Sequence, residues 1–147
     1  MAETTETITK EIHIDASPET VFGFFTEAEK LTRWFCSEAT TDPRPGGINH
    51  QTHPGDDVDG LADPNGPYFM QGEFLELDPP HRVVFTWGYT NSSIGVEPGL
   101  TRVEVTFTEA DGGTDLRLVH SRIPNDESGN SFDKGWDQML GNLAGAF

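Results

Sequence analysis

Few side chains in this sequence could do acid–base, nucleophilic or metal chemistry: there are five histidines and one cysteine. His50 and His53 lie close together in a strand-like run but point to opposite faces of it, so they cannot share a metal ion. We expect Cys36 to be a small buried apolar residue and not a nucleophile. The sequence contains no Gly-x-Ser-x-Gly elbow, no phosphate-binding glycine loop and no HExxH motif. We therefore assign no catalytic residue, no metal ligand and no cofactor.

His120 is the polar side chain of greatest interest. It alternates with Leu116 and Leu118 along a strand-like run, so its imidazole is predicted to enter an otherwise apolar space. Burial in such a space would lower the pKa of the ring and keep it neutral. Two interpretations stay open. His120 is either a core residue hydrogen-bonded to a backbone carbonyl or a tyrosine hydroxyl, or a group that contacts a ligand or takes part in catalysis.

Large apolar side chains could surround this histidine. With it, they form the predicted ligand-binding set: Trp34, Phe85, Trp87, His120, Trp136, Met139 and Leu140. The alternative is that these residues are ordinary core without any ligand contact, as most large apolar residues are. The sequence pattern is compatible with both.

A C-terminal helix, predicted over residues 128–147, must position part of this site. At about 100° per residue its large apolar side chains fall within one arc: Phe132, Trp136, Met139, Leu140, Leu143 and Phe147. Its interior glycines each cost on the order of 1 kcal/mol relative to alanine, so the helix would not persist alone in water. It must pack on another element, most simply across a curved sheet.

The rest of the chain predicts that sheet and two short helices. Alternation predicts a strand over Ile8–Ile14, Ser17 then caps a helix that begins with Pro18, and a second short helix covers Ala28–Trp34. Further strand-like runs follow: Ser37–Asp42, Ile48–His53, Tyr68–Leu77, Arg82–Tyr89, Leu100–Thr108 and Thr114–Arg122. The segment Pro54–Pro67 reads as a surface loop. We predict an α+β fold in which a curved antiparallel sheet of about six or seven strands grips a long C-terminal helix.

Length and composition limit the function classes. Residues 1–7 are predicted to be a disordered tail and residues 8–147 a single domain. The 147-residue chain has 25 acidic and 9 basic residues and a net charge of −16, which argues against nucleic acid or an anionic membrane as a partner. It has neither a secretory signal nor a span long and apolar enough to insert into a membrane, and its single cysteine fits a reducing compartment. We predict an acidic cytoplasmic protein.

Several motifs in this order resemble the START-like (SRPBCC, helix-grip) superfamily and, more narrowly, the activator of heat-shock-protein ATPase homologue (AHSA) family. They are Ile14-x-Ala16-Ser17-Pro18-Glu19-x-Val21-Phe22, Leu31-x-x-Trp34-Phe35, Asp42-x-Arg44-x-Gly46-Gly47, Gly72-Glu73-Phe74-Leu75-Glu76-Leu77-Asp78-Pro79-Pro80, Phe85-Thr86-Trp87, Leu116-x-Leu118-x-His120-Ser121 and Gly135-Trp136-x-x-Met139-Leu140-x-x-Leu143. The resemblance spans roughly residues 8–147.

The resemblance implies a cavity between the sheet and the C-terminal helix, which in relatives holds lipids, sterols, polyketides or other apolar molecules. We therefore expect the protein to bind a small apolar, lipid-like or polyketide-like molecule. Two alternatives remain: a cyclase- or hydrolase-type enzyme that uses His120 with a nearby carboxylate, and a module that stimulates a chaperone ATPase through a protein partner. The chain is expected to be a monomer or a homodimer, and the sequence does not name the ligand.

Overall fold

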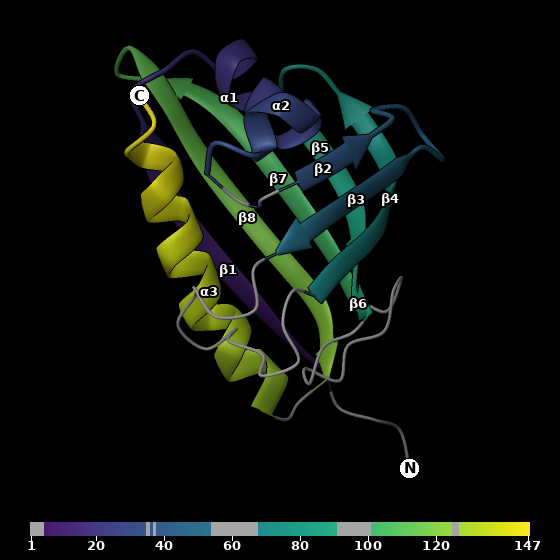
Figure 1. Ribbon diagram of the computed structural model, residues 1–147. Coiled ribbons are helices and arrows are strands. Elements are labelled where there is room, and N and C mark those ends of the chain that lie inside the picture. The colour runs from purple at the N-terminus through teal and green to yellow at the C-terminus, as the bar shows by residue number, and fades with distance from the viewer. Residues whose placement is uncertain (1–4, 35, 37, 54–67, 91–100, 125–126) are drawn as a thin grey trace.

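The computed structural model describes residues 5–34, 36, 38–53, 68–90, 101–124 and 127–147. The predicted loop Pro54–Pro67 and residues 1–4 of the predicted tail lie outside this part of the chain. Within this part of the chain, eight strands form one sheet, shown in Figure 1: β1 (Thr5–Ile14), β2 (Glu38–Thr41), β3 (Ile48–His53), β4 (Tyr68–Asp78), β5 (Arg82–Trp87), β6 (Tyr89–Thr90), β7 (Thr101–Ala110) and β8 (Gly113–Pro124). The described residues also form three helices: α1 (Pro18–Thr26), α2 (Ala28–Leu31) and α3 (Glu127–Ala144).

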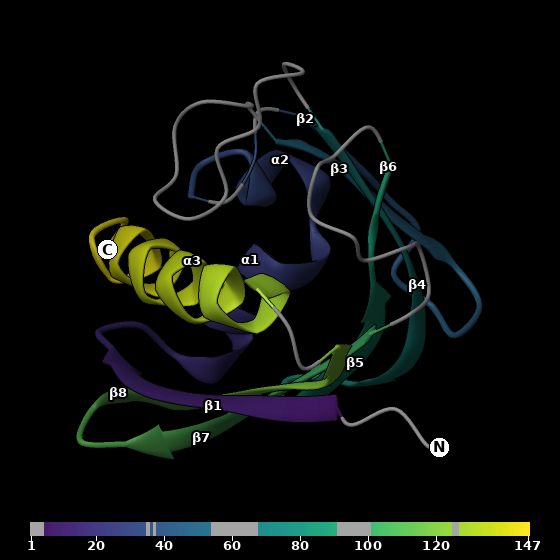
Figure 2. The same ribbon diagram turned by 90° about the horizontal axis from the view of Figure 1, so that it is seen from below.

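The strands pair antiparallel throughout, in the order β1-β8-β7-β5-β4-β3-β2, and β6 pairs with β4. The predicted antiparallel sheet with a long C-terminal helix is therefore confirmed. Viewed from below, the sheet curves, and α1, α2 and α3 all lie on its concave side (Figure 2). We call this concave side the inner face.

Two predicted strand boundaries need correction. β1 begins at Thr5 and not at Ile8, because Thr5 and Glu6 already pair with the last residues of β8. Residues 5–7, predicted as part of a disordered tail, thus belong to the sheet. The predicted strand Arg82–Tyr89 is divided at Gly88, after which β6 continues along β4.

The two predicted short helices are present. Pro18 occupies the first turn of α1, and the Ser17 hydroxyl oxygen accepts a hydrogen bond from the Thr20 amide, which caps the helix. α2 ends at Leu31, three residues before the predicted end at Trp34. Aromatic contacts pack α1 on the sheet: Phe22 and Phe25 each contact the Phe107 ring edge-on, with ring centroids 5.5 Å apart.

α3 packs on the inner face through the predicted stripe, with one exception. Trp136, Met139, Leu140 and Leu143 are all buried. Phe147, predicted to lie on the same stripe, follows the end of the helix and is 42% exposed, with its ring 4.7 Å from that of Phe24. The Phe132 side chain lies outside the described part of the helix.

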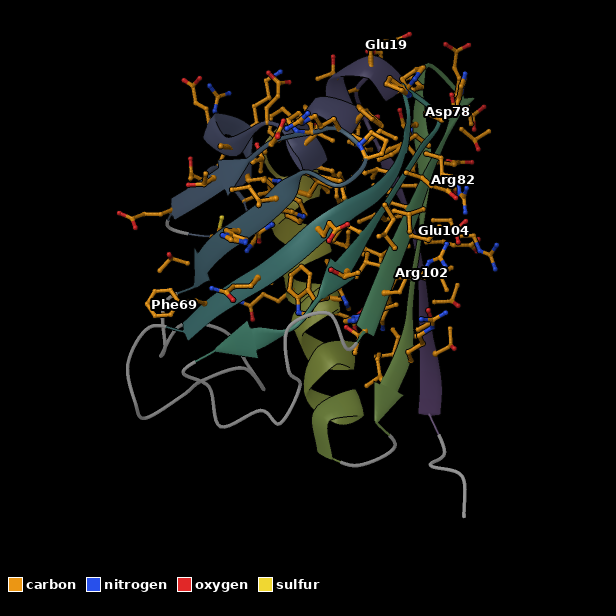
Figure 3. All side chains as sticks on the ribbon, turned by 90° about the vertical axis from the view of Figure 1, so that its right-hand side faces the viewer. Glu19, Phe69, Asp78, Arg82, Arg102 and Glu104 are labelled. Atoms are coloured by element: carbon orange, nitrogen blue, oxygen red, sulfur yellow. The ribbon has the colours of Figure 1, made fainter. Side chains whose placement is uncertain are left out.

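The outer face of the sheet is polar, as alternation predicts. Arg82 on β5 donates one hydrogen bond to Glu104 on β7, at 2.9 Å, and another to Glu76 on β4. Figure 3 shows Arg82, Glu104 and Arg102 projecting on the side of the sheet away from α3. The charged side chains thus lie on the outer face, and the apolar side chains of β5, β7 and β8 lie on the inner face.

Candidate functional site

Three rings from three elements meet on the inner face: Trp87 of β5, His120 of β8 and Trp136 of α3. The centroid of Trp87 lies 5.5 Å from that of Trp136 and 6.0 Å from that of His120, and His120 and Trp136 are 6.0 Å apart. Each ring is at most 3% exposed. We call these residues the indole–imidazole group. They are far apart in sequence: strand pairing brings Trp87 and His120 together, and the packing of α3 on the sheet adds Trp136.

A chain of hydrogen bonds connects this group and determines the tautomer of the histidine. The Trp136 indole Nε1–H donates to His120 Nδ1 at 3.0 Å, and an indole nitrogen can only donate. Nδ1 is therefore the acceptor, and we assign the proton of the neutral ring to Nε2. Nε2 donates to the Thr101 hydroxyl at 2.7 Å, and that hydroxyl donates to the Trp87 carbonyl oxygen at 3.0 Å.

The imidazole is neutral because it is buried. Burial lowers the pKa of His120 to about 3, and protonation would also place a second N–H donor against the Trp136 indole. His120 is thus a hydrogen-bonded core histidine, and its partners are Trp136 and Thr101 instead of the backbone carbonyl or tyrosine expected. Any direct contact between His120 and a ligand stays a prediction.

The other predicted site residues divide into two groups. Phe85 lies 6.1 Å from Trp87, and Met139 and Leu140 are buried on the same helix as Trp136. Trp34 lies in another part of the same hydrophobic core: its ring is 5.0 Å from that of Phe25 on α1. Its indole N–H donates to the carbonyl oxygen of Phe24, on the same helix, at 2.9 Å. Ring contacts therefore connect Phe85, Trp87, His120 and Trp136 directly, whereas the ring contact of Trp34 is with Phe25 of α1.

The inner face also carries two buried amides that the sequence analysis did not single out. On β3, Asn49 is 0% exposed and Gln51 is 3% exposed, whereas Ile48 is 41% exposed. Gln51 Nε2 donates to Asn49 Oδ1 at 3.2 Å. The two amides occupy alternate positions of the strand, as side chains on one face must. The usual assumption that apolar residues face inward would instead have placed Ile48 on the inner face.

Asn49 lies in line with the indole–imidazole group across the sheet. It pairs directly with Gly72 of β4. The Gln71 amide donates to the Gly88 carbonyl at 3.0 Å, which sets Gly72 beside Trp87 on β5. Trp87, Gly72 and Asn49 therefore form one row on the inner face, and Asn49 is two strands from Trp87, or roughly 10 Å.

Glycine at position 72 contributes no side chain to this row. A β-carbon there would collide with the Thr86 carbonyl oxygen and lie 3.3 Å from Met70 Sδ. The β4 backbone approaches its neighbour closely at this point, so the position does not accept a larger residue. The row consequently presents an indole at one end and a primary amide at the other, and the Met70 side chain lies beside the glycine between them.

Other chemistry has little support within the described residues. None of the groups of His, Cys, Asp and Glu in this part of the chain has the arrangement needed to hold a metal ion. Cys36 is buried, and burial raises the pKa of its thiol to about 12, so it is not a thiolate nucleophile at neutral pH. Among the helices that the structure describes, none is long and apolar enough to cross a membrane.

A curved antiparallel sheet that encloses an aromatic group with a C-terminal helix defines the helix-grip class of proteins. Within that class, the family described as "Activator of Hsp90 ATPase homolog 1-like protein" matches residues 15–147. The chain belongs to this family, and the resemblance predicted from the motifs is confirmed.

Solved structures share the fold over nearly the whole chain. The AHSA1-like protein RHE_CH02687 from Rhizobium etli is 33% identical, with a TM-score of 0.68 over 96% of this chain and 81% of that one. CalU16 from Micromonospora echinospora is 23% identical, with a TM-score of 0.69 over 95% of this chain and 74% of that one. DynU16, a putative protein in the dynemicin biosynthetic locus, is 22% identical, with a TM-score of 0.69 over 94% of this chain and 45% of that one. The comparison with curated proteins found no match.

Proposed function

We propose that this protein binds a small apolar molecule between the inner face of the sheet and α3. The observation that carries the proposal is the composition of the inner face, where the indole–imidazole group lies in line with the buried amide of Asn49, which is itself hydrogen-bonded to that of Gln51. An apolar lining with a few fixed polar groups is typical of small-molecule sites. The biosynthetic locus named for DynU16 is compatible with a lipid-like or polyketide-like ligand.

The state of His120 favours binding over acid–base catalysis. A general base works best when its pKa lies near the operating pH, and burial lowers the pKa of His120 to about 3. Both ring nitrogens are also engaged, by Trp136 and Thr101. In our proposal His120 holds the two indoles in position, and a cyclase- or hydrolase-type activity would require a different proton acceptor.

The compartment and the partners are part of the same proposal. A buried lone cysteine is compatible with the reducing cytoplasm. The net charge of −16 disfavours polyanionic partners. A protein partner, such as a chaperone ATPase, is the remaining alternative, for a monomer or a homodimer.

Native mass spectrometry of freshly purified protein tests the binding proposal. We expect a fraction of the protein to carry one non-covalent adduct of small-molecule mass, which organic solvent extracts. Protein without adduct should increase the fluorescence of N-phenyl-1-naphthylamine, a probe that emits strongly in apolar surroundings. The absence of both the adduct and probe binding would contradict a ligand-binding function and favour the protein-partner alternative.

A further inference from the structure

Asn49 has a hydrogen-bond donor with no partner. Its side chain is 0% exposed, and its Nδ2 atom makes no hydrogen bond in the part of the chain that the structure describes. Buried polar groups are nearly always hydrogen-bonded, because an unmade bond leaves the cost of desolvation uncompensated. An amide nitrogen in this state indicates a missing acceptor.

The oxygen end of this amide already has a partner within the protein. Gln51 Nε2 donates to Asn49 Oδ1, which uses the oxygen end of the Asn49 amide within the protein. The nitrogen end is therefore left to a partner that can accept a hydrogen bond. Asn49 also shares its row with Gly72 and Trp87, so a molecule that supplies the acceptor at Nδ2 would extend toward the Trp87 indole past Gly72 and the neighbouring side chain of Met70.

We propose that Asn49 Nδ2 donates a hydrogen bond to a neutral carbonyl oxygen of the ligand, whose apolar body lies against Trp87 and Trp136. This inference rests on the proposed function and narrows it to a ligand class: apolar molecules, such as ketones, esters or quinones, with a carbonyl at one end.

A carboxylate would be a poorer acceptor at this place. The buried polar side chains of the described chain are Thr26, Asn49, Gln51, Thr101, Thr114 and His120, so this set contains no lysine or arginine to pair with an anion. An ionised group taken out of water without a counter-ion is strongly disfavoured. The net charge of −16 adds long-range repulsion against anions.

A displacement assay with three matched compounds tests the inference. Each compound competes with N-phenyl-1-naphthylamine on the wild-type protein: 2-acetylnaphthalene has the carbonyl, 2-isopropylnaphthalene has the same shape without it, and 2-naphthoate has a carboxylate. We expect 2-acetylnaphthalene to displace the probe at a concentration about tenfold lower than 2-isopropylnaphthalene, the size expected for one buried hydrogen bond. We expect 2-naphthoate to be the weakest competitor.

Two variants test whether Asn49 causes the preference for 2-acetylnaphthalene. Asn49→Leu should remove the preference for 2-acetylnaphthalene while 2-isopropylnaphthalene still displaces the probe. His50→Leu changes a polar residue on the same strand but on the outer face, and it should keep the preference. If Asn49→Leu does not fold, nitrogen–proton spectra of the wild-type protein provide the test, because the Asn49 side-chain amide signals should shift with 2-acetylnaphthalene and not with 2-isopropylnaphthalene.

The possible results separate this inference from the function it rests on. Equal displacement by 2-acetylnaphthalene and 2-isopropylnaphthalene, or unmoved Asn49 amide signals, would overturn the role of Asn49 and leave apolar binding intact. Failure of N-phenyl-1-naphthylamine itself to bind, together with the absence of a small-molecule adduct in native mass spectrometry, would overturn the proposed function. Stronger displacement by 2-naphthoate than by 2-acetylnaphthalene would overturn the choice of a neutral carbonyl.

Discussion

At the scale of single residues, the protonation of His120 depends on how it is buried. Nδ1 accepts from Trp136 and Nε2 donates to Thr101, so the neutral ring satisfies both neighbours and the charged ring does not. The position of His120 on an apolar strand face could be predicted from its alternation with leucines. Its partners could not, because Thr101 and Trp136 reach it only through strand pairing and helix docking.

This burial predicts a loss of stability in mild acid. The pKa of His120 is lowered from 6.5 to about 3 in the folded protein, so between these values the unfolded chain binds more protons, and stability falls as the pH falls. One such group accounts for about 2 kcal/mol between pH 7.5 and pH 5. In urea unfolding experiments, the wild-type protein should lose about that much more stability over this range than His120→Gln, which retains a donor and an acceptor but does not titrate. Equal losses in the two proteins would show that His120 is not buried in its neutral form.

At the scale of elements, α3 depends on the sheet beneath it. The apolar stripe predicts both the helix and its buried residues, and α3 does bury Trp136, Met139, Leu140 and Leu143. β3 shows the opposite behaviour, since it exposes Ile48 and buries Asn49 and Gln51. The pattern of apolar residues predicts which side of an element is buried when only apolar side chains pack against the core. It fails on β3, where two polar side chains occupy the inner face.

The docking of α3 can be measured by removing its central ring. Trp136→Ala should lower the free energy of unfolding by roughly 3–5 kcal/mol, because it deletes a buried indole and the hydrogen bond to His120. Asn142→Ala, on the exposed side of the same helix, should change it by less than about 0.5 kcal/mol. A loss below about 1 kcal/mol for Trp136→Ala in denaturant melts would mean that α3 is not packed on the sheet as described.

At the scale of the whole molecule, the sheet separates two environments. Its outer face carries paired charges such as Arg82 and Glu104, while its inner face carries the indole–imidazole group and the amides. The order of strands and helices and the family could be inferred from sequence, since each motif is local. The row formed by Trp87, Gly72 and Asn49 could not, because it depends on the registers of three strands.

The most direct test of ligand binding at this place follows the three indole N–H signals of nitrogen-15-labelled protein during titration with 2-acetylnaphthalene. Trp87 and Trp136 belong to the proposed site. The Trp34 indole N–H donates a hydrogen bond to the Phe24 carbonyl oxygen of α1 and provides an internal control. We expect the Trp87 and Trp136 signals to shift together and saturate, while the Trp34 signal stays in place. Saturating shifts of Trp34 alone, or no shift of Trp87 and Trp136 while the compound binds, would contradict ligand binding between the inner face and α3.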